Sequence, residues 1–297
     1  GVLAAAVDAL AKKAAGVFIY AYLAVAQLHE SGGVVTLGEI ECMPDGVGEF
    51  YAERIERALD DQVGELEDDP VWRILQLVCA AKSPIPLAAL PALLDEDATR
   101  DGRRRVNEAV AALSVVLLTH NGVLQASHKS VVDHLVDESR ELERLYVDLR
   151  DVHRALGRRC AEIGRGRASA VVDAAVAERG EGRDAAVEGA LGRSGDATRF
   201  ALRHAVTHLC EAEDAESGAL AVGLVTDFEW LLARLLCAEA VHRVDRDATM
   251  ASKAGARSAE GARAARLVAR LLQIADGALS YEPLQLAGQC LSRMPEG

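Results

Sequence analysis

The 297-residue sequence is poor in aromatic residues and lacks paired cysteines. Only 4% of its residues are Phe, Trp or Tyr although half are hydrophobic, so Ala, Leu and Val must fill the core. Such small aliphatic side chains suit closely packed helices. No CxxC pair occurs among the six cysteines, at positions 42, 79, 160, 210, 237 and 290. We therefore expect free thiols, most of them buried, in a cytoplasmic protein rather than a disulfide framework.

The sequence also lacks the common catalytic signatures. It has no GxxxxGK[ST] phosphate loop, no GxSxG nucleophile elbow and no HExxH zinc motif. We therefore expect no enzyme activity, no catalytic residue and no bound cofactor in this chain alone.

Basic residues are outnumbered, 33 against 46 acidic, which gives a net charge of −13. Neutralisation of phosphates supplies most non-specific nucleic acid affinity, so this balance disfavours a nucleic acid partner without excluding a local basic patch. Lys12 and Lys13 precede an apolar run, 14–26, that is too short to span a bilayer, which takes about 20 residues. We expect a core helix there and no membrane partner. The first residue is Gly rather than Met, which indicates a piece of a longer protein.

The most informative stretch is 106–137, where we expect helix, hairpin and helix in succession. Asn121-Gly122 favours a two-residue turn because both residues readily adopt positive φ. Apolar residues at 115–118 and 123–124 flank the turn as short strands. A second helix is expected to open at Ser127-His128. Preceded by helices at 71–81, 87–94 and 106–117, this order predicts a winged helix.

The rest of the chain is expected to be mainly α. We predict a helical segment (1–65), a winged-helix domain with a small β-hairpin (66–137) and an α-helical arm (138–297). Within the first segment, helices are expected at 2–30 and 50–63, with a Gly-rich connection between them. In the arm, helices are expected at 128–145, 147–163, 199–212, 219–241, 259–278 and 280–294. Weak periodicity predicts a flexible insertion near 164–195 that contains at most one marginal helix, and a polar linker at 245–259.

Three histidine arrangements and one arginine run could carry function. His204 and His208 are four residues apart and can share a helix face, but Cys210 lies on another face, so a metal site lacks ligands. His128 and His134 do not share a face. His128 alone lies at a helix start, where backbone N–H groups favour an anion. Arg103 to Arg105 would suit a groove-reading helix, or simply a solvated helix start.

Several of these segments, in order, resemble the region that follows the nucleotide-binding core in NACHT-type STAND NTPases, signalling ATPases that often end in WD or ankyrin repeats. Residues 13–21 resemble K-x-x-G-x-F-x-Y-A, and 127–135 resemble the H-x-S-[FV]-x-[DE]-[FH]-L block that closes the family's winged helix. The remaining matches are 50–59, 71–81 with 84–87, 202–209 with Phe200, and 285–289.

The resemblance implies a non-catalytic regulatory region that couples nucleotide state to domain rearrangement and assembly. It implies that His128 contacts the β-phosphate of ADP held by a core absent from this sequence. The implied cofactor is ADP or ATP in the parent protein. The implied partners are its NTPase core and repeat domain, other proteins, and further copies of the chain in a homo-oligomer.

Two other interpretations stay open from the residues themselves. One is a winged-helix nucleic acid-binding protein that uses Arg103 to Arg105. The other is a helical scaffold that binds a protein partner through an apolar groove.

Overall fold

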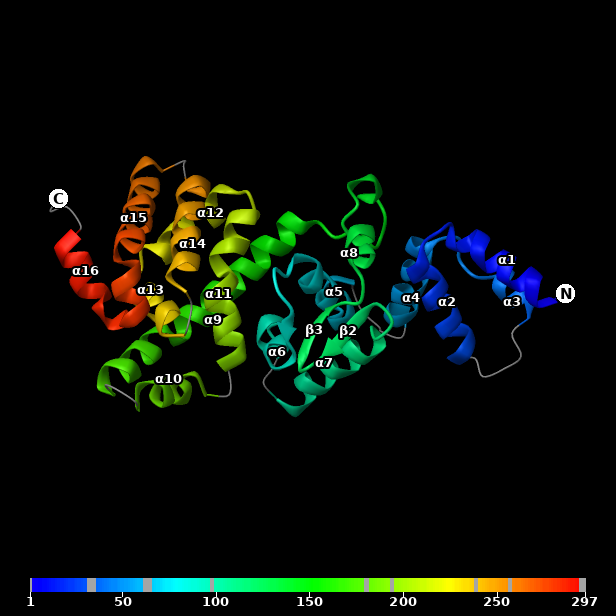
Figure 1. The fold of residues 1–297 in the computed structure, drawn as a ribbon, viewed down its shortest axis with the longest axis horizontal. Coiled ribbons are helices and arrows are strands. Elements are labelled where there is room, and N and C mark those ends of the chain that lie inside the picture. Colours follow the sequence, from blue (N-terminus) through cyan, green and yellow to red (C-terminus); the bar gives the residue numbers. More distant parts are fainter. Residues whose placement is uncertain are drawn as a thin grey trace. The chain divides into compact units, whose positions relative to one another are not determined.

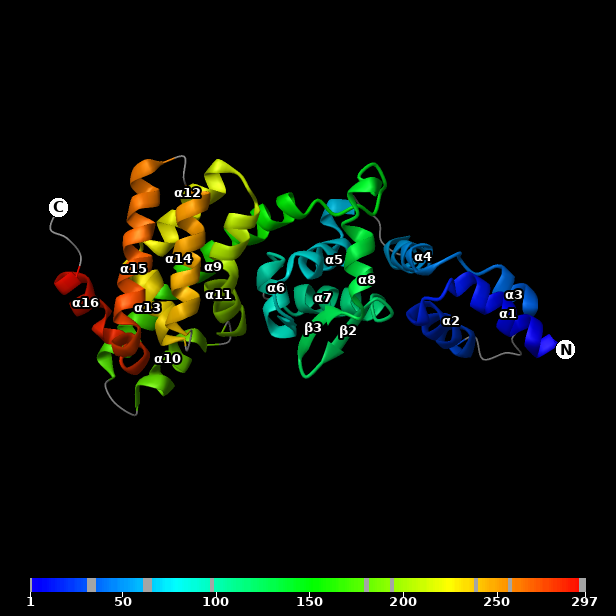
Figure 2. The same cartoon turned by 45° about the horizontal axis from the view of Figure 1, so that its top comes forward.

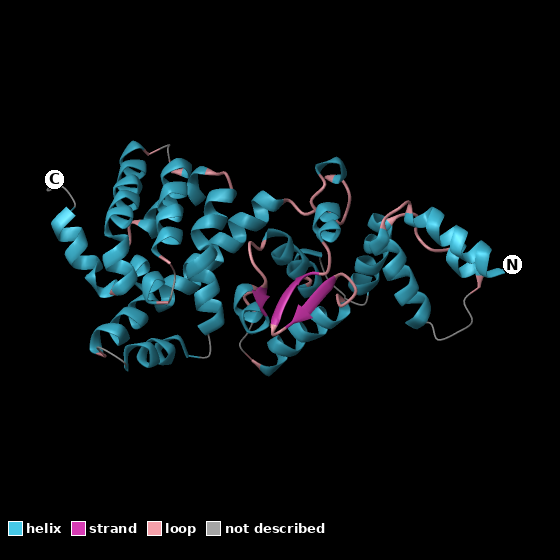
Figure 3. Cartoon of the chain, in the orientation of Figure 1, coloured by secondary structure: helices cyan, strands magenta, loops and turns pink. Residues whose placement is uncertain are grey.

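The computed structural model describes residues 2–30, 36–60, 66–96, 99–178, 182–192, 195–237, 240–255 and 258–293. The predicted mainly α fold is confirmed: most of these residues are helical, and the strands among them are short (Figure 1; Figure 3). The chain divides into two compact units. Unit 1 comprises 1–79 and 103–147, and unit 2 comprises 80–102 and 148–297. The three-domain division at 65/66 and 137/138 stays a prediction.

Unit 1 begins with two helices, α1 (Val2–Ala14) and α2 (Phe18–Glu30), which confirm the helices expected at 2–30. The turn between them uses positive φ at Ala15 and Gly16. A short helix, α3 (Leu37–Glu41), follows in the Gly-rich connection. Thr36 starts it with a capping box, since Thr36 and Glu39 satisfy each other's backbone N–H groups. Residues 31–35 and 61–65 lie outside the described part.

The helix expected at 50–63 is present as α4 (Val47–Asp60), which buries Phe50, Tyr51 and Ile55. Tyr20 of α2 meets Phe50 edge to face, with ring centroids 5.9 Å apart. The Tyr20 hydroxyl also donates to the Pro44 carbonyl at 2.6 Å. These contacts hold together α2, α4 and the segment that follows α3, around a core of aromatic side chains.

The central part of the chain holds η1 (Leu66–Asp68), α5 (Pro70–Ala80), α7 (Arg100–Ala112), β2 (Leu117–His120) and β3 (Val123–Ala126). β2 and β3 pair antiparallel, with Leu117 opposite Ala126 and His120 opposite Val123. Asn121 and Gly122 have φ of 49° and 76°. The predicted two-residue turn and hairpin are therefore confirmed. α7 begins and ends earlier than the helix predicted at 106–117.

The helix predicted at 128–145 is too long. α8 (Lys129–Leu135) ends after seven residues, and η3 (Glu138–Arg140) follows. Asp137 stops α8 because its carboxylate accepts the Ser139 N–H at 3.0 Å and starts η3. Val147 N–H then donates to the Leu135 carbonyl at 2.8 Å, which closes the loop back onto the end of α8.

Unit 2 contains β1 (Ile85–Pro86), η2 (Leu87–Ala89) and α6 (Leu90–Leu93), followed by an array of longer helices. Those helices are α9 (Leu149–Ala177), α10 (Arg183–Leu191), α11 (Gly195–Glu211), α12 (Ala215–Val225), α13 (Phe228–Leu236), α14 (Val241–Ala254), α15 (Ala259–Tyr281) and α16 (Leu286–Arg293), with η6 (Pro283–Gln285) before the last. α9 packs on α10, α11 and α13, and α14 lies beside α15 in both views (Figure 1; Figure 2).

The described part of 164–195 contains more helix than the single marginal helix predicted for the insertion there. α9 continues to Ala177, and α10 occupies much of the rest. The periodicity is weak because the inward positions carry small residues. Gly164, Ala168, Val171 and Ala175 follow one another at spacings of three or four, and all are buried. These small residues make the inward face of the helix only slightly more hydrophobic than its other faces, but they allow neighbouring helices to approach closely.

The polar linker predicted at 245–259 is also wrong, because α14 runs through it to Ala254. Its buried stripe, Val241, Val244, Ala248 and Ala251, has helical spacing. Asp227 divides the helix predicted at 219–241 by capping α13, where its carboxylate accepts the Trp230 N–H at 3.1 Å. The helices expected at 199–212 and 259–278 are confirmed as α11 and α15.

Candidate functional site

His128 lies where the sequence places it, at the start of the helix after the hairpin. It is the N-cap of α8, with an extended backbone (φ −152°, ψ 150°). Its Nδ1 accepts the Ser130 N–H at 3.2 Å, so the imidazole does what a Ser or Asp side chain does at other caps. This cap fixes the ring while the side chain as a whole stays exposed.

A chain of hydroxyl groups connects His128 to α4. Ser130 Oγ lies 2.7 Å from His128 Nδ1, and the Tyr51 hydroxyl lies 2.9 Å from Ser130 Oγ. Tyr51 is fully buried, and burial raises the pKa of its hydroxyl, which therefore remains a donor at neutral pH. Because Nδ1 already accepts a backbone N–H, we assign the direction Tyr51 to Ser130 to His128.

This direction determines the tautomer of the neutral His128 ring. A nitrogen that accepts hydrogen bonds carries no proton, so the proton lies on Nε2. Nε2–H is then a donor on an exposed side chain at the start of a helix. A donor in that position can bind an oxyanion.

His134 lies in the last turn of α8 and helps to fix this helix against α4. Its ring meets that of Tyr51 edge to face, 6.4 Å between centroids. It also lies so close to Gly48 that a Cβ there would be 2.7 Å from His134 Nδ1. Burial and, to a smaller extent, the nearby Arg140 guanidinium together lower the pKa of His134 to about 4. His134 is thus half-buried while His128 is exposed, as expected of residues on different faces.

The structure does not place Arg103 to Arg105 at the first turn of α7, since the helix begins at Arg100. All three side chains are exposed. Arg104 pairs with Glu108 one turn later at 3.6 Å, so part of the positive charge is offset locally.

His204 and His208 share a face of α11, as predicted, and both are buried. His204 Nε2 lies 2.8 Å from Ser83 Oγ. His208 instead stacks on a third histidine, His153 of α9, with Nδ1 atoms 2.9 Å apart and ring centroids 5.1 Å apart. One Nδ1 must donate and the other accept, so these two rings hold opposite tautomers.

The histidine cluster packs α9 against α11. Burial lowers the pKa of His153 to about 4 and that of His208 well below its usual value, so both rings are neutral. Within the described ranges, no group of three His, Cys, Asp or Glu side chains is arranged to hold a metal ion. His153 was not singled out by its sequence, because nothing local pairs it with a residue 55 positions away.

The six cysteines lie outside any disulfide, as expected, but only Cys160 and Cys237 are buried, so the expectation that most of them are buried is wrong. Cys42 is exposed, whereas burial raises the pKa of Cys79 and of Cys160 to about 12. Those two thiols are therefore inert packing residues at neutral pH.

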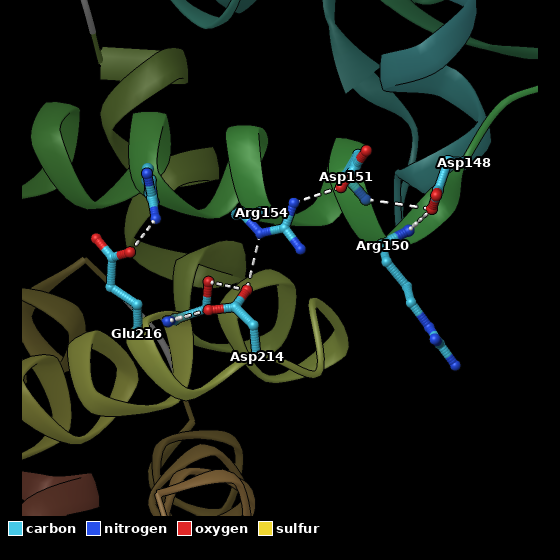
Figure 4. Close-up of polar contacts among 8 residues, drawn as sticks. Asp148, Arg150, Asp151, Arg154, Asp214 and Glu216 are labelled. Carbon is cyan, nitrogen blue, oxygen red and sulfur yellow. Dashed lines mark hydrogen bonds and ion pairs between the residues drawn. The ribbon is translucent and has the colours of Figure 1, made fainter.

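Ion pairs join α9 to α12 in unit 2 (Figure 4). Arg154 Nε donates to Asp214 Oδ2 at 2.9 Å, and Arg158 pairs with Glu216 at 2.8 Å. Asp214 also caps α12 by accepting the Ser217 N–H at 2.8 Å. The cap and its cation hold the pKa of Asp214 far below its usual range. This arrangement fixes the start of α12 on α9.

No family model, curated protein or solved structure matches this chain. No helix in the described segments combines the length and apolar character needed to cross a bilayer.

Proposed function

We propose that this chain is a non-catalytic regulatory region of a NACHT-type STAND NTPase. It would couple the nucleotide state of an ATPase core in the parent protein to domain rearrangement and assembly. In this proposal the nucleotide is ADP or ATP, the first partners are the parent's own core and repeat domain, and the protein works in the cytoplasm. The observation that carries it is the Nε2–H donor of His128 at the start of α8.

The chemistry of that donor suits a diphosphate. Nδ1 is occupied by Ser130, so the ring cannot turn Nε2 inward without losing the cap. A phosphate oxygen that accepts from Nε2 would also lie near the positive end of the helix dipole. A hydrogen bond to a charged group contributes about 1.5–3 kcal/mol, enough to bias a switch between two states.

The element order supports a winged helix around this histidine. Along the chain, α5 is followed by β1, α6, α7 and the β2–β3 hairpin, with α8 after the wing. This is the order of helices, short strands and wing that the resemblance implies.

The Tyr51 hydrogen bond gives the proposed switch a mechanical link. Tyr51 belongs to α4, which the resemblance places in the helical segment after the core, and it contacts the cap of the closing helix through Ser130. A phosphate that holds His128 would therefore also hold α8 against α4. Loss of the phosphate would free one end of this chain of hydrogen bonds.

The test is the rate of ADP release from the full parent protein. We expect His128→Ala to raise the ADP off-rate by about tenfold or more, since one charge-assisted hydrogen bond is lost. His120→Ala, which removes an exposed histidine of β2 in the same module, serves as the matched control and should leave the off-rate unchanged. The proposal would be overturned if the His128→Ala variant is folded and releases ADP at the same rate as the wild type.

A second candidate rests on the three exposed arginines of α7. If the module binds duplex nucleic acid through Arg103, Arg104 and Arg105, binding should weaken steeply as salt rises. A duplex titration at two salt concentrations separates the two proposals. Tight, salt-sensitive binding abolished by an R103Q/R104Q/R105Q variant would favour this second function.

A further inference from the structure

An open groove lies between α14 and α15 in unit 2, two helices that pack side by side (Figure 1; Figure 2). Its volume is about 770 Å³, within the range of about 300–1,000 Å³ that is usual for small-molecule sites. α14 and α15 line it with Thr249, Ser252, Lys253, Arg266, Ala269, Arg270 and Gln273. Three of these lining residues are cationic and none of them is acidic. The groove is therefore positively charged in a chain whose net charge is −13.

Helical spacing brings the three cations close together. Arg266 and Arg270 are four residues apart on α15, so their Cβ atoms lie about 5–6 Å apart on one face. Lys253 belongs to α14, and the axes of packed helices are about 8–10 Å apart. All three side chains are long and line the same groove. Their charged groups can therefore reach one anion.

No carboxylate neutralises these cations within the part of the chain that the structure describes. None of Lys253, Arg266 and Arg270 forms an ion pair there. Elsewhere in the same unit such pairs do form, as between Arg158 and Glu216 at 2.8 Å. Like charges one turn apart on a helix, such as those of Arg266 and Arg270, destabilise it slightly. A bound anion would remove this repulsion.

A carboxylate at one end of the groove is held by a neutral side chain. Gln273 Nε2 donates to both carboxylate oxygens of Asp245 on α14, at 3.1 and 3.2 Å. Asp245 is not a lining residue, and counting it against the three cations still leaves an excess of two positive charges. A phosphate monoester carries about −1.5 to −2 at neutral pH, which matches this excess.

The floor of the groove offers a hydroxyl donor. Ser252 is buried and Thr249 is half-buried. Ser252 Oγ donates to the Thr249 carbonyl at 2.8 Å, so the only proton of this hydroxyl is already used. The Thr249 hydroxyl has no hydrogen-bond partner among the described residues. A phosphate oxygen in the groove would supply its acceptor.

We propose that this groove binds the phosphate group of a small phosphomonoester, such as a sugar phosphate or a nucleoside monophosphate. Guanidinium groups donate to phosphate oxygens in pairs, and an ammonium group adds a point charge. The three acceptor oxygens of a phosphomonoester match two guanidinium groups and one ammonium group from two helices. A carboxylate, with one charge, would leave part of the excess uncompensated. The site is remote in sequence from His128, and the proposal stands whether or not the chain belongs to a STAND NTPase.

Calorimetric titration of the chain at low ionic strength tests the site, with inorganic phosphate, glucose 6-phosphate and AMP as separate probes. We expect saturable one-to-one binding. Arg266→Gln and Arg270→Gln should each weaken it about tenfold or more, because each removes a charge-assisted hydrogen bond. Both side chains are exposed, so circular dichroism should show an unchanged fold. Arg167→Gln, which removes an exposed arginine of α9 outside the groove, is the charge-matched control and should bind like the wild type.

A neutral substitution separates a hydrogen-bonding site from diffuse attraction. Thr249→Val removes the hydroxyl without changing any charge, and it should weaken binding about threefold to tenfold. Unchanged affinity in this variant would overturn the role of Thr249 as a donor. An ester that binds more tightly than inorganic phosphate would support the phosphomonoester, and the tighter of glucose 6-phosphate and AMP would identify a sugar phosphate or a nucleotide as the source.

Three results would overturn the proposal. One is no saturable binding of any of the three probes. Another is equal weakening by Arg167→Gln, which would show general attraction of anions to the chain. The third is a phosphoserine peptide that binds more tightly than every small probe, which would assign the groove to a protein partner.

Discussion

Gly164 of α9 lies against the indole of Trp230 on α13. A Cβ on Gly164 would lie 2.4 Å from Cζ3 of that ring, closer than any real contact. Trp230 is fully buried, so the ring has no open space to move into. The close packing of α9 on α13 therefore depends on the missing side chain.

Gly164→Ala should destabilise unit 2, because the added methyl overpacks a closed interface. We expect the free energy of unfolding to fall by about 1–3 kcal/mol, although Ala is the better helix former. Gly166→Ala, two residues later and with open space around the position, should instead stabilise by about 0.5–1 kcal/mol. Urea denaturation measures both. A Gly164→Ala variant as stable as the wild type would show that α9 and α13 can move apart and accommodate the added methyl group.

The buried His153–His208 pair predicts that stability declines on acidification. Burial lowers the pKa of His153 to about 4, whereas the unfolded chain has the ordinary value of about 6.5. Between these values the unfolded state binds more protons, so the free energy of unfolding falls as the pH drops from about 6.5 to about 4. The loss from His153 alone can reach roughly 3 kcal/mol.

His153→Asn should flatten that dependence while lowering stability at neutral pH. The measurement is chemical denaturation at about pH 7, above the titration window, and at about pH 5, within it. If the variant and the wild type lose the same stability between these two conditions, His153 does not titrate as described.

Asp214 combines a helix cap with an ion pair, and two substitutions can separate them. Asp214→Ala removes both and should lower the free energy of unfolding by about 1–2 kcal/mol. Asp214→Ser keeps a capping oxygen and loses only the partner of Arg154, so it should lose less than half as much, since partly exposed ion pairs contribute little. Equal losses in thermal or urea unfolding would assign the whole effect to the ion pair.

Removing one member of the buried pair Arg234–Asp247 should destabilise the protein more than removing both. Asp247→Asn leaves a buried guanidinium without its counter-charge and should cost about 3–5 kcal/mol. The double variant Arg234→Met/Asp247→Leu removes both charges and should recover most of that loss. Denaturation of Arg234→Met, Asp247→Leu and the double variant completes a double-mutant cycle, and additive losses would argue against coupling.

Local chemistry made part of this structure predictable from sequence. The Asn121-Gly122 turn and the position of His128 at a helix start depend on neighbouring residues only, and both are present. The sequence predicts too little helix in the regions of α9 and α14. The inward face of α9 carries many Gly and Ala residues, and the apolar residues of α14 are interspersed with charged ones. Val241, Val244, Ala248 and Ala251 did carry a helical signal for α14.

The contacts that define the sites could not be predicted in this way. Tyr51 and Ser130 are 79 residues apart, and Ser83 and His204 are 121 apart. Nothing in the local pattern of either member indicates its partner.

The 29-residue helix α9 has a consequence for how unit 2 opens. It contacts α6, α10, α11, α12 and α13. Local unfolding in the middle of α9 would therefore disrupt its packing against several other helices at once. Backbone amides along α9 should therefore exchange with deuterium slowly and at similar rates, as one cooperative block. A protease should find its first cleavage points elsewhere in the unit.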